Sequence, residues 1–151
     1  MRRTGAICAL IVLWLALLGG RALGQDPRYL QPEPEEAHAI QSIIQAQLDA
    51  FQKDDAEKAF SYAAPAIRKR FGTAERFMTM VRESYAILYR PASVQFLPPA
   101  IIDGETIQAL RVVGRDGTVK VALYFMERQA DGSWKIKACE LAPSAAVFTR
   151  R

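Results

Sequence analysis

The sequence predicts an α+β domain in which helices come first and an antiparallel sheet follows. Between residues 36 and 85, apolar side chains recur at helical spacing on one side of each segment. After Val94, short stretches rich in β-branched and aromatic residues are separated by Asp-Gly pairs, the strongest short hairpin signal. Because the two kinds of segment do not alternate, we expect the helices to pack on one side of the sheet.

The first 24 residues predict a secretory signal peptide. Two arginines precede an apolar run over 6–18, and Ala22 and Gly24 occupy the positions three and one before a cleavage site. The apolar run is shorter than the roughly 20 residues that a membrane-spanning helix needs. We therefore expect cleavage before Gln25, export to the periplasm or out of the cell, and no integral membrane span afterwards.

Removal of residues 1–24 changes the charge and the cysteine count. Three arginines and no acidic residue leave, which lowers the net charge from +4 to +1 and removes the compositional argument for a nucleic-acid partner. The basic run 68–70 is typical of a solvated surface, with a contact to anionic lipid as the alternative. Cys8 also leaves, so Cys139 has no intramolecular disulfide partner. We expect Cys139 to be a small buried side chain, with an intermolecular disulfide or a reactive thiol as alternatives.

The exported chain is expected to begin with a leader and a long helix. Three prolines in residues 25–36 predict an extended leader. From about Glu36 to Lys53, the side chains on one side of the predicted helix are apolar and those on the other side are polar. This amphipathic helix is the strongest periodic signal in the sequence.

Three short helices are predicted next. Asp54 and Glu57 have the spacing of a capping box, with Asp54 as the N-cap of the first short helix. A second is expected over 65–71, where Pro suits the first turn and Gly follows the last. Thr73 is the expected cap of a third over about 74–85.

Four strands are expected, over Val94–Leu97, Thr106–Gly114, Thr118–Arg128 and Ser133–Leu141. Asp-Gly pairs at 103–104, 116–117 and 131–132 predict turns, so the last three strands should form a meander. We expect one domain over 37–141, followed by a tail over 142–151. The strands are apolar on both faces, although a solvated face normally carries polar residues. Either the sheet curls around a pocket or its outer face meets a partner, such as a second copy of the chain.

Four motifs are similar to those of a known family. They are Asp-Asp-Ala-Glu-Lys-Ala-Phe at 54–60, Pro65 followed by Phe-Gly-Thr at 71–73, Tyr-Arg-Pro at 89–91 and Asp-Gly-Ser-Trp-Lys-Ile at 131–136. From Ala37 to Leu141 the chain resembles a bacterial family designated domain of unknown function 4864. The resemblance implies a nuclear-transport-factor-2-like, or cystatin-like, cone fold, with helices packed on a strongly bent sheet around a conical cavity. It implies no activity and no catalytic residue.

Four aromatic residues are our candidates for the mouth of a pocket: Tyr85, Tyr89, Tyr124 and Trp134. Each carries a polar group that needs a partner when the ring is buried, unlike the phenylalanines of the core. The remaining aromatic and methionine side chains are the expected core or pocket lining. The expected occupant of the pocket is a small apolar ligand or part of a protein partner.

The sequence offers few groups for catalysis. His38 is the single histidine and lies at the polar start of the long helix, and one remaining cysteine gives no zinc spacing. We therefore expect no metal and no cofactor. Glu127 and Glu140 are the only acid/base candidates on strands, and Glu140 shares its alternation side with Trp134 and Ile136.

These observations predict an exported, non-catalytic module that binds a small ligand or a protein. No Gly-rich phosphate loop or nucleophile-elbow motif is present. The alternative is an enzyme of the isomerase or hydratase type, acting on a small apolar substrate with Glu127 or Glu140 as the base.

Overall fold

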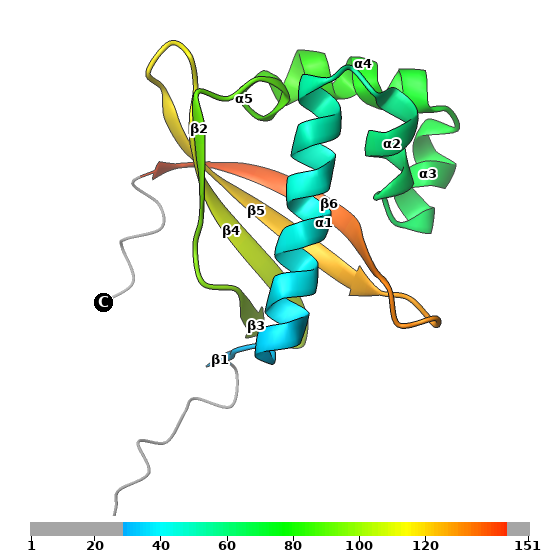
Figure 1. The fold of residues 1–151 in the computed structure, drawn as a ribbon, viewed down its shortest axis with the longest axis vertical. Coiled ribbons are helices and arrows are strands. Elements are labelled where there is room, and N and C mark those ends of the chain that lie inside the picture. The colour runs from blue at the N-terminus through cyan, green and yellow to red at the C-terminus, as the bar shows by residue number, and fades with distance from the viewer. Residues whose placement is uncertain (1–28, 145–151) are drawn as a thin grey trace, which may run out of the picture.

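The computed structural model describes residues 29–144 and has the α+β architecture that the sequence predicts (Figure 1). The predicted signal peptide, Cys8 and the end of the predicted tail lie outside these residues. The helices are α1 (Pro34–Gln52), α2 (Ala56–Ser61), α3 (Pro65–Phe71), α4 (Ala74–Ser84) and α5 (Ala86–Tyr89). The strands are β1 (Tyr29–Leu30), β2 (Ser93–Phe96), β3 (Ala100–Ile102), β4 (Glu105–Val113), β5 (Val119–Arg128) and β6 (Trp134–Pro143).

The strands form one antiparallel sheet in the order β1-β3-β4-β5-β6, and β2 also pairs with β4. The predicted meander of the last three strands is confirmed. Strands β3 and β2 pair with successive parts of β4, at residues 105–107 and 110–113. Strands β1 and β3 were not predicted. Strand β1 lies in the segment expected to be an extended leader, and β3 is a three-residue strand directly after the prolines at 98 and 99, which cannot donate hydrogen bonds.

The Asp-Gly pairs form turns between strands, as predicted. Asp103 and Gly104 have φ values of 51° and 82°, the left-handed backbone that a two-residue hairpin turn requires between β3 and β4. Between β5 and β6, the Asp131 carboxylate accepts a hydrogen bond from the Ser133 amide at 2.9 Å, which closes the turn locally.

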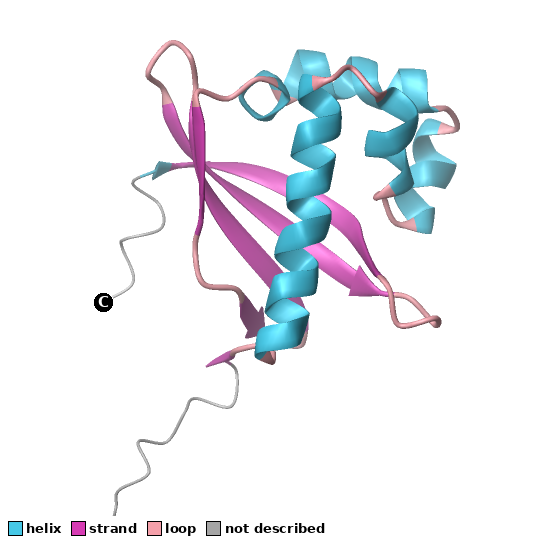
Figure 2. Cartoon of the chain, viewed as in Figure 1, coloured by secondary structure: helices cyan, strands magenta, loops and turns pink. Residues whose placement is uncertain are grey.

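The apolar side of α1 packs into the core, and α1 crosses in front of the sheet (Figures 1 and 2). Ile40, Ile44 and Leu48 are almost completely buried, and burial of each such side chain contributes about 1.5–3 kcal/mol. Buried Gln108 of β4 accepts a hydrogen bond from Gln41 of α1 and donates to the backbone oxygens of Leu97 and Ala109. The helix is therefore fixed to the sheet by apolar packing and by a satisfied polar contact.

Two boundaries differ from the sequence expectation. Helix α1 begins at Pro34 rather than near Glu36, because a proline in the first turn has no amide that needs a partner. The predicted leader over 25–36 is thus helical at its end, and residues 29–30 pair with β3. Strand β6 runs to Pro143, so the predicted tail over 142–151 overlaps it by two residues.

The predicted capping box at Asp54 is wrong. The N-cap of α2 is Asp55, whose carboxylate accepts a hydrogen bond from the amide of Lys58 at 2.9 Å. Asp54 instead has a left-handed φ of 56°, and its side chain points away from α2. A neighbouring aspartate with suitable backbone geometry therefore takes the capping role.

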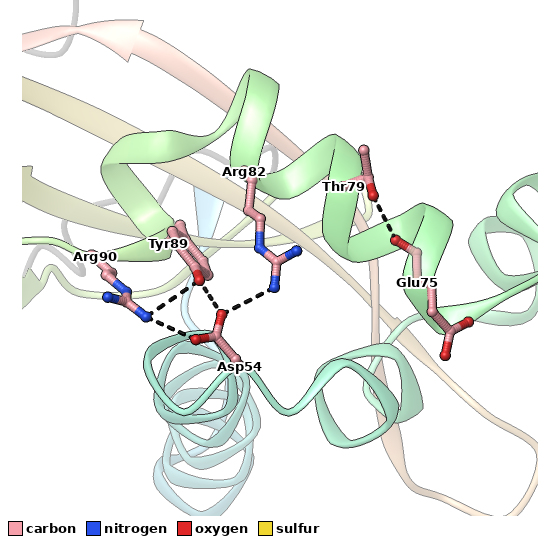
Figure 3. A network of polar contacts seen from close by, with 6 residues as sticks. All are labelled: Asp54, Glu75, Thr79, Arg82, Tyr89 and Arg90. Atoms are coloured by element: carbon pink, nitrogen blue, oxygen red, sulfur yellow. Dashed lines mark hydrogen bonds and ion pairs between the residues drawn. The ribbon is translucent and has the colours of Figure 1, made fainter.

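Asp54 lies at the centre of an exposed polar cluster (Figure 3). Its carboxylate accepts hydrogen bonds from the Tyr89 hydroxyl, from Arg82 at 3.1 Å and from Arg90 at 2.8 Å. Both guanidinium groups also lie over the Tyr89 ring, 5.5 and 5.0 Å from its centroid. The cluster joins the turn after α1 to α4 and to the end of α5.

None of the helices within residues 29–144 combines the length and the apolar character that crossing a membrane requires.

We expect the Asp54 cluster to make stability depend on pH. The hydrogen bond from Tyr89, and next that from Arg82, lower the pKa of Asp54 below 3.8. A lowered pKa stabilises the fold above the unfolded-state value and is lost as the pH falls through the folded-state value. Wild type should therefore be more stable than Asp54→Asn at pH 6, with a difference in urea midpoint that shrinks below pH 3.8.

Asp103→Asn is the matched control for this experiment. Asp103 has the same left-handed backbone and no ion pair with the other described residues. A loss of stability in Asp54→Asn that is equal at pH 3 and pH 6 would contradict the assignment.

Candidate functional site

A cavity of about 380 Å³ lies between the helices and the middle of strands β5 and β6. Helices α1, α3, α4 and α5 and strands β5 and β6 all contribute to its lining. Its walls are mainly apolar and include Phe51, Ile67, Phe71, Phe77, Leu88 and Ile136. Both the volume and the predominance of apolar side chains are typical of small-molecule sites.

The chain between α2 and α3 is fixed to β6 by two backbone hydrogen bonds. The Ile136 amide donates to the Tyr62 oxygen at 2.9 Å, and the Ala64 amide donates to the Ile136 oxygen at 2.8 Å. Pro65 then starts α3, which places Ile67 and Phe71 in the wall of the cavity. The position of α3 is therefore set by its start, since none of its residues is fully buried.

An aromatic cluster forms the wall on the helical side. The Phe77 ring centroid lies 6.3 Å from that of Phe51, 5.3 Å from that of Phe60 and 5.7 Å from that of Phe71. Such tilted and edge-on pairs contribute about 0.5–1.5 kcal/mol each beyond area burial. The wall is consequently well packed from α1 to α4.

Tyr124 of β5 brings a buried hydroxyl to the cavity. Its side chain is almost completely buried, and the hydroxyl makes no hydrogen bond of normal geometry with an oxygen or nitrogen of the described residues; the Cys139 thiol, a weak acceptor, lies beside it. Burial raises the pKa of Tyr124 well above 10, with a smaller contribution from the adjacent Cys139 thiol. The hydroxyl is therefore protonated at neutral pH and can donate a hydrogen bond into the cavity.

Cys139, the cross-strand neighbour of Tyr124, also lines the cavity. Although the residue is partly exposed as a whole, burial of its thiol raises the pKa to about 12. The thiol is thus protonated at neutral pH, which argues against the reactive-thiol alternative because the thiolate is the nucleophile.

Tyr85 is half-buried and lines the same cavity. Its hydroxyl donates a hydrogen bond to the Cys139 backbone oxygen at 2.9 Å, which holds the ring against β6. Burial raises the pKa of Tyr85 above 10.

Two cations and no carboxylate lie among the residues that line the cavity. Lys137 forms an ion pair with Glu105. Arg70 of α3 lies over the Phe71 ring, 5.6 Å from its centroid, and forms no ion pair with a carboxylate of residues 29–144. The cavity therefore has an excess of positive charge at Arg70.

The structure brings two of the four predicted aromatic residues together. Tyr85 and Tyr124 line the cavity, whereas Tyr89 and Trp134 do not. Tyr89 belongs to the Asp54 cluster, and half-buried Trp134 lies at the start of β6 with the Arg128 guanidinium 5.8 Å from its ring centroid.

Neither Glu127 nor Glu140 lines the cavity, and both are exposed. A bulge in β6 explains the position of Glu140. Phe125 pairs with Ala138 and Met126 pairs with Ile136, so Lys137 is an extra residue that reverses the alternation of β6. Cys139 therefore opposes Tyr124, and Glu140 pairs with Leu123 on the other face of the sheet, not on the side of Ile136.

Sequence analysis missed Arg70 and Cys139 as residues of the site. A signal existed for Arg70, because it follows Ile67 by three residues and such positions share one face of a helix. No such signal existed for Cys139, because the bulge decides on which face of the sheet its side chain lies.

Within residues 29–144, no three side chains of the His, Cys, Asp and Glu types are grouped as metal ligands would be.

Comparison with protein families finds one family model that covers most of the chain. A family model described as "Domain of unknown function (DUF4864)" matches residues 33–148. No curated protein and no solved structure shows significant similarity to the chain.

We expect removal of the hydroxyl to affect the free energy of unfolding differently at the two cavity tyrosines. Tyr124→Phe removes a buried group that has no oxygen or nitrogen partner among the described residues, so the free energy of unfolding should stay equal or rise by about 1 kcal/mol. Tyr85→Phe breaks a hydrogen bond and should lower it by about 0.5–1.5 kcal/mol. Urea unfolding of both variants measures the difference, and a loss above about 1 kcal/mol for Tyr124→Phe would contradict the assignment.

Proposed function

The chain belongs to the DUF4864 family, and on this premise we propose that it is an exported, non-catalytic module that binds a small, largely apolar molecule in its cavity. The observation that carries the proposal is the Tyr124 hydroxyl, which is buried at an apolar cavity with only the weakly accepting Cys139 thiol beside it. A bound molecule with a hydrogen-bond acceptor would satisfy this donor. We also propose that the domain is a nuclear-transport-factor-2-like cone, in which helices close such a cavity against the sheet.

The chemistry of the lining favours binding over catalysis. The pKa values of Tyr85, Tyr124 and Cys139 are all raised, so at neutral pH these groups can donate a proton to a hydrogen bond but do not act as bases. The alternative enzyme needs a carboxylate base in the cavity, and both candidate strand carboxylates lie elsewhere. The lining thus offers recognition groups without a general base of the expected kind.

Binding can be tested with a neutral apolar dye, N-phenyl-1-naphthylamine, on protein obtained by export of the full chain. We expect saturable binding with a blue-shifted emission. The intact mass of the same protein checks whether the mature chain begins at Gln25. Ile67→Trp should weaken dye binding at least 10-fold, because the indole would occupy the cavity wall.

Ala66→Trp is the matched control, since it adds the same side chain to the exposed side of α3. This variant should bind the dye as wild type does. Dye binding that survives Ile67→Trp unchanged in a folded protein would place the dye outside the cavity and overturn the proposal.

We also propose that a second copy of the chain packs on the outer face of the sheet. This face, opposite Gln108 and Tyr124, carries the half-buried apolar side chains of Ile107, Ala109, Leu123 and Phe125. An antiparallel sheet that meets only water would carry polar residues at these positions.

Sedimentation velocity at tens of micromolar tests the dimer. We expect a dimer for wild type and a monomer for Phe125→Lys, because an interface would bury the unpaired ammonium group. Glu83→Lys is the control at an exposed site of α4, away from this face of the sheet, and it should remain dimeric. A monomeric wild type would overturn the dimer and leave the cavity proposal intact.

A further inference from the structure

We propose that the molecule bound in the cavity is an amphipathic carboxylic acid. Its carboxylate is held by Arg70 at the mouth, its apolar body lies against the aromatic wall, and a neutral hydrogen-bond acceptor reaches Tyr124 in the interior. This inference rests on the proposed binding function and adds the chemical class of the ligand.

The charges around the cavity select an anionic headgroup. No aspartate or glutamate lines the cavity, and Glu140, whose carboxylate acts electrostatically on Tyr85 and Cys139, lies on the other face of the sheet. Lys137 is neutralised by Glu105, whereas Arg70 has no carboxylate partner among the described residues. A guanidinium group can bind a carboxylate through two parallel hydrogen bonds.

The position of Arg70 places this headgroup at the mouth. Arg70 is exposed, and it follows Ile67 on the same face of α3. The half-buried Tyr85 lies within electrostatic range of both Glu140, whose effect is larger, and Arg70. A ligand can therefore keep its charge near water while its body contacts Ile67 and Phe71.

The interior selects a neutral group rather than a second charge. Tyr124 is almost completely buried, and the ionisable groups that act on it, Cys139 of β6 and Tyr85 between α4 and α5, are uncharged at neutral pH. A carboxylate placed there would lose its hydration without gaining a cation, which is costly. A hydroxyl, carbonyl or ether oxygen would accept the Tyr124 hydrogen bond at far lower cost.

Competition against N-phenyl-1-naphthylamine tests the headgroup with three ten-carbon probes: decanoate, 1-decanol and decylamine. We expect decanoate to bind wild type at least 5-fold more tightly than decylamine, with 1-decanol between them. Arg70→Gln should abolish this preference, measured as the ratio of the decanoate and decylamine affinities within the same variant. Arg68→Gln is the matched control, because Arg68 lies on the same helix over the Phe60 ring and does not line the cavity.

The outcomes separate this inference from the proposed function. Dye binding without a preference for decanoate, or a preference that survives Arg70→Gln, would overturn the carboxylic acid and leave the binding function standing. Absence of dye binding to wild type would overturn both.

A fourth probe, 10-hydroxydecanoate, tests the interior contact. Its affinity relative to decanoate should fall at least 5-fold in Tyr124→Phe, since the buried hydroxyl of the probe would lose its donor. Tyr85→Phe is the control, because the Tyr85 hydroxyl already donates to a backbone oxygen. An unchanged ratio in Tyr124→Phe would overturn the interior part of the inference.

Discussion

The cavity depends on the backbone attachment of the α2–α3 connection to β6. Two hydrogen bonds of Ile136, to Tyr62 and Ala64, hold the start of α3 against the sheet although α3 buries none of its residues completely. Buried backbone groups need hydrogen-bond partners. Because these two bonds supply them, the connection can lie against the sheet without leaving a buried amide or carbonyl group unpaired. The wall formed by Ile67 and Phe71, and the cation at Arg70, follow from that attachment.

The bulge in β6 decides which chemical groups the sheet presents. One extra residue at Lys137 reverses the alternation, so that Cys139 faces the cavity and Glu140 faces away. Without it, a carboxylate would lie among apolar side chains, where its pKa would rise and a general base would be available. Because of the bulge, β6 presents the protonated thiol of Cys139 to the cavity and not the carboxylate of Glu140.

The site and the Asp54 cluster use similar residue types in different ways. Tyr89 shares an exposed carboxylate with two arginines, and exposed ion pairs of this kind contribute little to stability individually. Tyr124 is buried with only the weakly accepting Cys139 thiol beside its hydroxyl, which is costly for the isolated domain. Polar groups that cost stability and line a cavity are expected where a ligand completes them. The contrast separates a tyrosine that makes structural contacts from the one proposed to contact a ligand.

The sequence by itself determined the succession of α1 to α4, the turns at the Asp-Gly pairs and the pairing of the last three strands, because helical periodicity and turn chemistry are local properties. It also pointed to Tyr85 and Tyr124 through their polar atoms. Only the tertiary structure decided that Asp55 caps α2, that β3 and β1 extend the sheet, and that Arg70 and Cys139 meet at one cavity. These features depend on pairing between distant strands and on a one-residue bulge, and a shift of one residue reverses the face of every later side chain on a strand.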